Sequence, residues 1–403
     1  MHFVELLNNK IASSGTSINQ SGTTTSHKNQ DPSEHATLSK MRMSQLSNQY
    51  FAQLNIDPNT WTNIPKDERE QLSEYFPEVL KTVNKQIGDG GDTIKYLYEL
   101  TDGSLIESVI MKYYDEDFSD SINKGSTDGR SVPNNNNSTA GRSVPNKNNS
   151  ANDKDVSKKE SRATLCISCQ VGCAMACPFC ATGKLGLKRN LSLPELTEQI
   201  RLAKLEGVTN IVFMGMGEPT QNLKNIEAAV RAADKFGIFA KNITISTVGI
   251  PDGINELADF SVYEKFPFRL AISLHAGTNL TRDKLIPINK KYPIDEVLDA
   301  AFAFFKKTTR RVSIEYLLAK GVNDTEKEAY NLAKVLNRRG SNWAHVNIIP
   351  LNEVEGSDYF PSDKATQDVF INALKSKGIF VTVRESRGSD IDGACGQLAS
   401  KPV

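Results

Sequence analysis

From residue 161 to about 385, apolar runs of strand length alternate with longer amphipathic stretches. Six runs predict buried strands, over residues 163–170, 210–217, 242–249, 268–276, 311–319 and 345–352. Between them apolar residues recur at helical spacing, for example over 193–207 and 325–340. Because strands that alternate with helices form parallel sheets, the pattern predicts an α/β protein with six β/α units. Six units would make an incomplete (β/α)6 barrel, with functional side chains at the carboxyl ends of the strands.

The segment before the barrel has a different pattern. Residues 38–55 and 66–87 have helical spacing, so each predicts a helix. Residues 92–114 alternate apolar and polar positions on both sides of Asp102-Gly103, which is typical of a β-hairpin. We therefore predict a small α+β accessory domain in front of the barrel.

Two further segments show neither pattern. Residues 1–39 are rich in Ser, Thr and Asn, and residues 116–160 contain the imperfect repeat GRSVPNNNNSTA and GRSVPNKNNSAN. Segments of this composition bury too little apolar surface to order themselves. The chain is thus predicted to have four parts: a disordered tail over 1–39, the accessory domain over 40–115, a disordered insertion over 116–160 and a catalytic domain over 161–403.

Composition and charge narrow the function only a little. The 403 residues include 48 basic and 48 acidic side chains, so the net charge is zero. This argues mildly against a nucleic-acid-binding protein with a broadly basic surface, although a local basic patch can still bind. No apolar run is long enough to span a membrane. The N-terminal stretch shows no secretory signal and few features of a transit peptide, so a cytoplasmic protein is expected.

The cysteines carry the strongest chemical signal. Five of the six lie between residues 166 and 180, and the sixth is Cys395. Cys173, Cys177 and Cys180 form a C-x3-C-x2-C motif. Three thiolates this close together suit a metal centre, and three ligands would leave one iron of a cubane cluster open.

Structural zinc is the alternative for the same run. Cys166 and Cys169 form one C-x2-C pair, and Cys177 and Cys180 form another. The gap between the pairs is only seven residues, shorter than the usual spacing in zinc ribbons, and it contains the extra Cys173. The pattern therefore favours an iron–sulfur site, with zinc left open.

The other unusual polar residues fall at the ends of predicted strands. They are Gly217 and Glu218 in the segment GMGEP, Ser246, the triplet Ser273, Leu274 and His275, and Asn352. In a parallel barrel these strand ends share one rim with the cysteine run. Three basic residues that follow the cysteines, Lys184, Lys188 and Arg189, are candidates for contacts with phosphate groups near that rim.

Several of these motifs resemble one known family. The runs CISCQVGCAMACPFCATGKLGLKRNLS, FMGMGEPTQNL, ISTVGI, NIIPLN and RESRGSDIDGACGQLA are similar to segments of radical S-adenosylmethionine (SAM) enzymes of the RlmN/Cfr family of RNA adenosine methyltransferases. The resemblance is dense over 161–400 and looser over 40–115. It implies a radical-SAM barrel with one 4Fe–4S cluster and SAM as cofactors.

The resemblance also implies a role for each motif. Cys173, Cys177 and Cys180 would hold the cluster, and SAM would be bound by Gly217, Glu218, Ser246, Ser273, Leu274, His275 and Asn352. In the family one SAM methylates a cysteine, here Cys395, and a second SAM is cleaved to a radical that activates this methyl group. Cys166 would then release the methylated RNA by forming a disulfide with Cys395, and Glu107 would be the proton acceptor. Cys169 stands where the family pattern has serine and is interpreted as a bystander.

The family's substrates imply the partners. Large-subunit rRNA is expected as substrate, with tRNA as a second candidate, together with an electron donor such as flavodoxin or ferredoxin. Methylation of adenine C2, as in RlmN-type members, is favoured over C8, as in Cfr-type members. The protein is expected to be a monomer without membrane contact, and a zinc-stabilised RNA-binding protein without catalysis is the alternative from another class.

Overall fold

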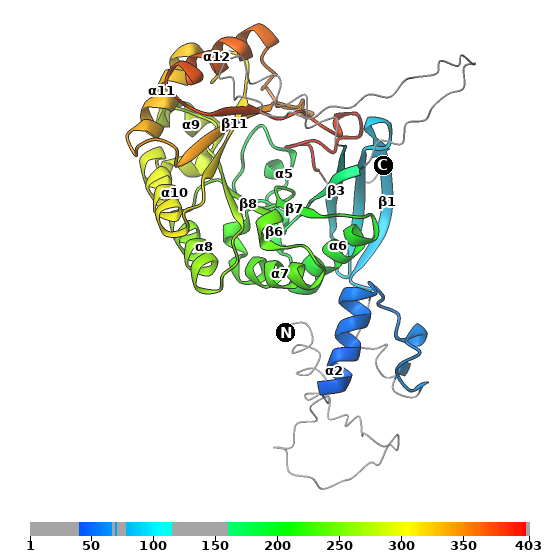
Figure 1. Cartoon of the computed structure of the whole chain (residues 1–403). Coiled ribbons are helices and arrows are strands. Elements are labelled where there is room, and N and C mark those ends of the chain that lie inside the picture. The colour runs from blue at the N-terminus through cyan, green and yellow to red at the C-terminus, as the bar shows by residue number, and fades with distance from the viewer. Residues whose placement is uncertain (1–39, 67–68, 71–77, 115–159, 400–403) are drawn as a thin grey trace, which may run out of the picture.

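The computed structural model describes residues 40–66, 69–70, 78–114 and 160–399. The predicted tail over 1–39 and nearly all of the predicted insertion over 116–160 lie outside these residues. Figure 1 shows a barrel-like body of strands with a smaller helical unit, containing α2, at one side.

Six parallel strands form the predicted incomplete barrel. They are β4 (Glu160–Cys166), β7 (Asn210–Phe213), β8 (Ile243–Thr247), β9 (Arg269–Ser273), β10 (Val312–Leu318) and β11 (Ala344–Pro350). Each falls within or beside one of the predicted runs, so the α/β class and the barrel are confirmed. A seventh parallel strand, β12 (Val381–Val383), pairs with β11 and was missed, because three residues are too few for a periodic pattern.

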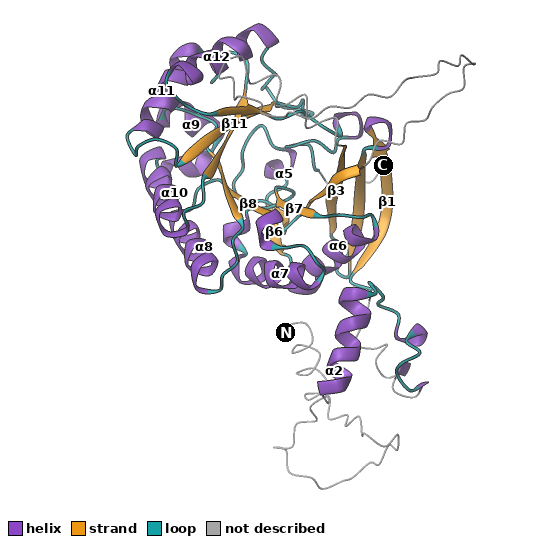
Figure 2. Cartoon of the chain, viewed as in Figure 1, coloured by secondary structure: helices purple, strands orange, loops and turns teal. Residues whose placement is uncertain are grey.

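The helices lie in a ring outside these strands (Figure 2). The longer ones are α6 (Leu193–Leu205), α7 (Leu223–Lys235), α8 (Pro251–Tyr263), α10 (Ile294–Thr308), α11 (Glu326–Asn337) and α12 (Lys364–Ser376). Their starts follow from local sequence: Ser192 and Glu195 form a capping box at α6, and Asp363 accepts a hydrogen bond from the backbone of α12. In the described part of the chain, no helix has the length and apolar character needed to cross a membrane.

Short elements connect the longer ones. They are α5 (Ala181–Lys184), α9 (Asn279–Leu285), the two-stranded sheet of β5 (Gln170–Gly172) and β6 (Leu187–Asn190), and the 3-10 turns η2 (Pro58–Thr60), η3 (Asp89–Gly91), η4 (Pro219–Gln221), η5 (Ala240–Asn242), η6 (Pro287–Lys290) and η7 (Ser389–Ile391). Most lie at the carboxyl ends of the barrel strands, where they shape the site.

The predicted hairpin is confirmed, but the C-terminal part of the helix predicted over 66–87 is a strand. β2 (Thr93–Leu100) and β3 (Leu105–Tyr114) pair antiparallel, and β1 (Leu80–Gly88) adds a third strand beside β2. Val83 and Ile87 are exposed on β1, so the apolar residues that suggested a helix face do not share a buried side. β3 also pairs antiparallel with β4, so these strands continue the barrel sheet into one of ten strands.

The first helical unit packs on the outside of the barrel. It consists of α2 (Lys40–Ser47) and the π-helical turn η1 (Asn48–Ala52), within the helix predicted over 38–55. Tyr50 and Phe51 pack against Phe236, with ring centroids 5.6 and 4.8 Å away. Arg201 of α6 donates a hydrogen bond of 2.6 Å to the carbonyl of Leu54. This unit is therefore fixed to α6 and α7, away from the strand ends that form the site.

Candidate active site

Two adjoining cavities open at the carboxyl ends of the barrel strands. The walls of the larger, about 940 Å³ in volume, include Cys173 and Cys177. The walls of the smaller, about 780 Å³, include Cys166. Cys180 and Cys395 line both. The sequence-predicted SAM residues meet at the larger cavity: Gly217, Glu218, Ser246, Ser273, His275 and Asn352. The structure therefore gathers these predicted residues around one cavity at the strand ends.

The three thiols of the C-x3-C-x2-C motif lie on one short loop. Cys173 follows β5, and Cys180 immediately precedes α5. Burial raises the pKa of Cys173 to about 12. Burial also raises the pKa of Cys177 well above its ordinary value, and the charges of Cys180 and Cys173 raise it further. The thiols are thus close enough to interact electrostatically, and a metal centre would have to displace their protons to bind.

The chemistry of these thiols bears on the kind of metal centre. Cys173, Cys177 and Cys180 all line the larger cavity. A 4Fe–4S cluster binds its thiolates at separate corners of one body, and it can be held by cysteines of a single loop. Three thiols on one cavity wall therefore fit a cubane cluster that would have one iron without a protein ligand.

Gly217 and Glu218 form the turn that ends β7. Gly217 has a φ of +105°, and a Cβ added there would lie 2.6 Å from the Cβ of Gln170, so only glycine fits this turn. The Glu218 carboxylate is buried and accepts hydrogen bonds from the Thr220 hydroxyl at 2.6 Å and from the Val248 backbone at 2.9 Å. Burial raises the pKa of Glu218. A buried carboxylate in a cavity wall gains from a cationic partner, which an ammonium group would provide.

His275 is a neutral wall residue. Its Nδ1 accepts a hydrogen bond of 3.1 Å from the backbone N–H of Leu317, so the ring proton belongs on Nε2. Burial lowers the pKa of His275 to about 3, and the nearby charge of Arg282 contributes. The ring packs edge to face against Phe179, with centroids 5.4 Å apart. His275 can therefore contribute shape and one neutral donor, and it carries no positive charge at neutral pH.

The neighbouring strand ends supply neutral polar groups. The hydroxyls of Ser246 on β8 and Ser273 on β9 are 3.4 Å apart, and both line the larger cavity. Leu274 is not among the residues that line the two cavities, and it is fully buried. Its backbone N–H donates to the carbonyl of Glu315. Of the predicted SAM residues, Leu274 alone is thus placed behind the cavity wall, where it could act only through the backbone.

The smaller cavity brings together two thiols that lie far apart in sequence. Cys166 ends β4 and is buried, whereas Cys395 is the only exposed cysteine. Both are free thiols. Burial raises the pKa of Cys166 to about 12, the charge of Cys395 raises it further, and Arg384 opposes the shift. The Asn352 side chain donates a hydrogen bond of 3.1 Å to the Cys395 carbonyl. This contact fixes the Cys395 loop at the boundary between the two cavities.

Comparisons with known proteins agree with this geometry. The family model of the radical SAM superfamily matches residues 167–333. A "Probable dual-specificity RNA methyltransferase RlmN" of Bifidobacterium adolescentis is 43% identical over 381 residues, which cover 90% of this chain and 86% of the relative. The chain belongs to the RlmN family. A relative of the same name from Kineococcus radiotolerans is 42% identical over 89% of this chain and 83% of its own.

A solved structure supports the same conclusion for the fold. The crystal structure of a radical SAM methyltransferase from Sphaerobacter thermophilus matches with a TM-score of 0.76 and 32% identity, over 99% of this chain and 98% of that one. Membership of the radical SAM superfamily implies a 4Fe–4S cluster and SAM. Membership of the RlmN family also decides against the alternative of a zinc-stabilised protein without catalysis.

Glu107 occupies a different place from the other predicted residues of this RlmN-family chain. It is buried on β3 and is not among the residues that line the two cavities. Its carboxylate accepts a hydrogen bond of 2.8 Å from the backbone of Ala399 and lies 3.4 Å from the ammonium group of Lys95. In this structure Glu107 therefore holds the segment that follows Cys395, and its role as proton acceptor stays a prediction.

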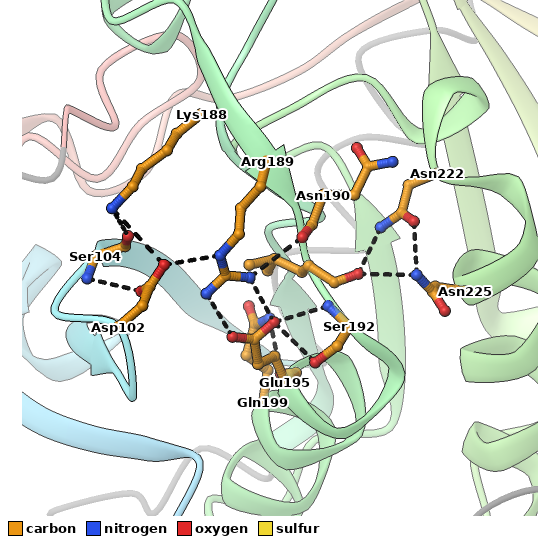
Figure 3. Close-up of polar contacts among 11 residues, drawn as sticks. Asp102, Ser104, Lys188, Arg189, Asn190, Ser192, Glu195, Gln199, Asn222 and Asn225 are labelled. Carbon is orange, nitrogen blue, oxygen red and sulfur yellow. Dashed lines mark hydrogen bonds and ion pairs between the residues drawn. The ribbon is translucent and has the colours of Figure 1, made fainter.

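The basic residues after the cysteines are largely engaged within the protein (Figure 3). Arg189 on β6 contacts Asp102 of the β2–β3 turn at 2.9 Å, and it forms a two-pronged ion pair with Glu195 of α6 at 2.8 and 2.9 Å. Lys188 donates a hydrogen bond of 2.5 Å to the Ser104 hydroxyl. These contacts join the β2–β3 turn to β6 and α6. Arg189 is thus a structural link here rather than the free phosphate contact that the sequence suggested.

The structure adds two residues that the sequence analysis missed. Glu315 is buried on β10, lines the larger cavity and accepts hydrogen bonds from Ser313 at 2.6 Å and Asn347 at 2.9 Å. The sequence analysis could have found Glu315, because it is a single acidic residue in the middle of an apolar strand. Arg384 lines the smaller cavity beside Cys166 and Cys395, and its position directly after a three-residue strand left no comparable signal.

Proposed function

We propose that the protein methylates adenine at C2 in large-subunit rRNA and in tRNA, with SAM as the source of the methyl group. The observation that carries the proposal is the position of Cys395. Its thiol lies at the boundary of two cavities, one lined by the C-x3-C-x2-C thiols and the other by Cys166. A methyl carrier must reach both the methyl donor and the acceptor base, and a shared wall provides that access.

In this proposal the larger cavity takes the cluster and SAM. The ligands of the cluster would be Cys173, Cys177 and Cys180, and the bound cluster would supply the electron that cleaves SAM. The buried Glu218 carboxylate suits the ammonium end of SAM, and the tight turn at Gly217 lets the ligand approach the backbone. The remaining contacts would come from Ser246, Ser273, the Leu274 backbone, neutral His275 and Asn352.

The smaller cavity would take the flipped-out adenine, since its ring atoms cannot be reached inside an RNA stack. Cys395 Sγ would first accept a methyl group from SAM. A radical derived from a second SAM would remove one hydrogen atom from this methyl group, and the carbon would then bond to adenine C2. C2 would lose its own hydrogen as a proton and one electron, with the oxidised cluster as the electron acceptor. Cys166 Sγ, as a thiolate, would then attack Cys395 Sγ. A disulfide forms, the S–C bond breaks, and the carbon keeps the electron pair and takes up a proton to become the methyl group.

The proposed reaction also requires two reductants. A one-electron donor of the flavodoxin or ferredoxin class would reduce the cluster, and a thiol reductant would restore the Cys166 and Cys395 thiols. We propose that the protein acts in the cytoplasm, where ribosomal RNA and tRNA are found, and that it acts as a monomer.

Nucleoside mass spectrometry tests the proposed function directly. In cells that carry the gene we expect 2-methyladenosine in digests of both 23S-type rRNA and tRNA, and in cells without it we expect the signal to disappear from both. Complementation with the intact gene is the control. A change in 8-methyladenosine instead would assign the Cfr-type reaction, and no change in either nucleoside would contradict the proposal.

Iron binding tests the register of the cysteine motif. Cys169 is buried, is not among the residues that line the two cavities, and donates its backbone N–H to Met216. We expect Cys169→Ser to keep its iron after anaerobic reconstitution and to lose no more than about 1–2 kcal/mol of stability for a buried hydroxyl. Cys173→Ser, the matched control on the other side of β5, should lose most of its iron. The reverse outcome would mean that Cys169 belongs to the motif.

A further inference from the structure

Arg282 is a fully buried cation beside the larger cavity. It lies on α9, and its side chain has 0% exposure. Its guanidinium donates hydrogen bonds to the carbonyls of Leu274 at 3.1 Å and Tyr292 at 3.3 Å, and to the Asn289 side chain at 2.9 Å. It also donates to the carbonyls of Val248 and Ser273. These acceptors are all neutral.

No carboxylate forms an ion pair with this charge. Within the described ranges, none lies at salt-bridge distance from Arg282, and Asp283 acts on it only electrostatically. The less buried Arg189 and Arg201, by contrast, each pair with a glutamate. Burial lowers the pKa of Arg282 to about 10, which still leaves the group protonated at neutral pH. Burying an unpaired cation costs stability. A neutral side chain could donate hydrogen bonds to the same carbonyls without that cost. The hydrogen bonds alone therefore do not explain why a charged residue stands here.

The geometry connects this charge to the cysteine loop. Cys173, Cys177 and Val248 pack in one cluster with Leu285 and Ile286, the residues at the end of α9. Val248 links the two groups through its backbone: its N–H donates to the Glu218 carboxylate, and its carbonyl accepts from Arg282.

The interaction with the thiols is also electrostatic. The charge of Arg282 acts on Cys177 and lowers the pKa of that thiol, and Cys177 acts in return on Arg282. The guanidinium therefore lies within electrostatic reach of the thiol loop, and because both residues are buried, solvent screens this interaction only weakly.

We propose that Arg282 is a positioning residue whose fixed positive charge raises the reduction potential of the cluster held by Cys173, Cys177 and Cys180. The inference rests on the proposed function, since it requires that cluster. One electron passes from a donor of the flavodoxin or ferredoxin class to the cluster, and Arg282 makes and breaks no bond and keeps its proton. The reduced cluster carries one more negative charge, so a nearby buried cation stabilises the reduced state more than the oxidised one.

The test is a redox titration of the reconstituted protein, followed by electron paramagnetic resonance without SAM or RNA. We expect Arg282→Met, which removes the charge and keeps the length, to lower the midpoint by at least the equivalent of a tenfold change in the equilibrium constant, about 59 mV for one electron. Arg282→Lys keeps the charge and should stay closer to the wild type. A purely structural role would move iron content or stability in both variants and leave the midpoint unchanged.

A second variant keeps the test decisive if Arg282→Met does not fold. Asp283 is partly exposed, accepts a hydrogen bond of 2.6 Å from Asn289, and acts electrostatically on Arg282. Asp283→Asn removes a negative charge next to the cation, so it should raise the midpoint, the opposite direction. Asp368→Asn, on the exposed side of α12, is the matched control and should leave it unchanged.

The outcomes separate the two proposals. Wild-type protein that binds no cluster would overturn the proposed function and this inference together. A cluster that forms normally but keeps the wild-type midpoint in both Arg282→Met and Asp283→Asn would overturn this inference alone.

Discussion

Replacing Cys395 by alanine is expected to abolish RNA methylation while the cluster and SAM still bind. The thiol lies at the boundary of both cavities, whereas the loop around it is held through the backbone, by Asn352 on the Cys395 carbonyl and by Ala181 on the Gly396 carbonyl. Removing the sulfur should therefore leave the cavities intact. Loss of the covalent carrier should lower turnover by a factor on the order of 10⁴ or more, as loss of a covalent nucleophile does in other enzymes. Transfer of labelled methyl groups from SAM to RNA measures it.

Cys169→Ser is the matched control. It also removes a cysteine thiol, but Cys169 is not among the residues that line the two cavities. It should methylate RNA at nearly the wild-type rate. Iron content and SAM affinity of Cys395→Ala should match those of the wild type, which separates a chemical loss from misfolding. Turnover by Cys395→Ala would show that the methyl group travels without this carrier, and the protein would then be a radical-SAM enzyme with another mechanism.

The barrel could be predicted from the sequence because its strands are buried on both faces and its helices on one face. Each kind of burial leaves its own pattern of apolar residues. The run over 268–276, for example, has six apolar residues in nine, and β9 lies within it. In the same way, a glycine pair followed by Glu218 marks a strand end without knowledge of the partners of the strand. Such features depend on local periodicity, so they survive without tertiary information.

Other features depend on contacts between distant segments and could not be predicted. The apolar residues of β1 have helical spacing in the sequence, but this segment forms a strand because it pairs with β2. Arg189 stands in a basic run that suggested phosphate binding, yet it pairs with Glu195 and with Asp102, and Asp102 lies 87 positions away in the chain. Glu107 was expected near the base, and its engagement by Ala399 depends on how the C-terminal segment folds back.

That C-terminal segment explains why the strands before the barrel belong to the site. Arg387 donates a hydrogen bond of 2.8 Å to the Lys112 carbonyl of β3, and the Gly388 backbone donates one of 2.6 Å to Asp89 at the end of β1. Figure 1 shows this last part of the chain crossing to the side of β1 and β3. The segment that carries Cys395 is thus anchored on β1–β3, while Cys166 stands at the end of the adjoining β4. The sheet extension therefore sets the position of one thiol relative to the other.

This arrangement leads to the expectation that Cys166→Ala traps the RNA on the protein. The substitution leaves Cys395, the cluster thiols and the larger cavity unchanged, so methyl transfer to Cys395 and its joining to adenine should proceed. Release requires a thiolate that attacks Cys395 Sγ, and Cys166 is the buried thiol that shares the smaller cavity with it. Without Cys166 the covalent adduct should accumulate to nearly one RNA per active protein, visible as a protease-sensitive band in a denaturing gel.

Three comparisons make the trapping experiment decisive. The double variant Cys166→Ala with Cys395→Ala should form no adduct, because the carrier is missing, and Cys169→Ser should release its product. In the wild type, burial holds the pKa of Cys166 near 12 and Arg384 opposes this shift, so only a small fraction of the thiol is ionised at neutral pH. Release of the adduct should therefore accelerate as the pH rises from 7 to 9, when measured in a single turnover. Free methylated RNA from Cys166→Ala at the wild-type rate would mean that another group breaks the bond to Cys395.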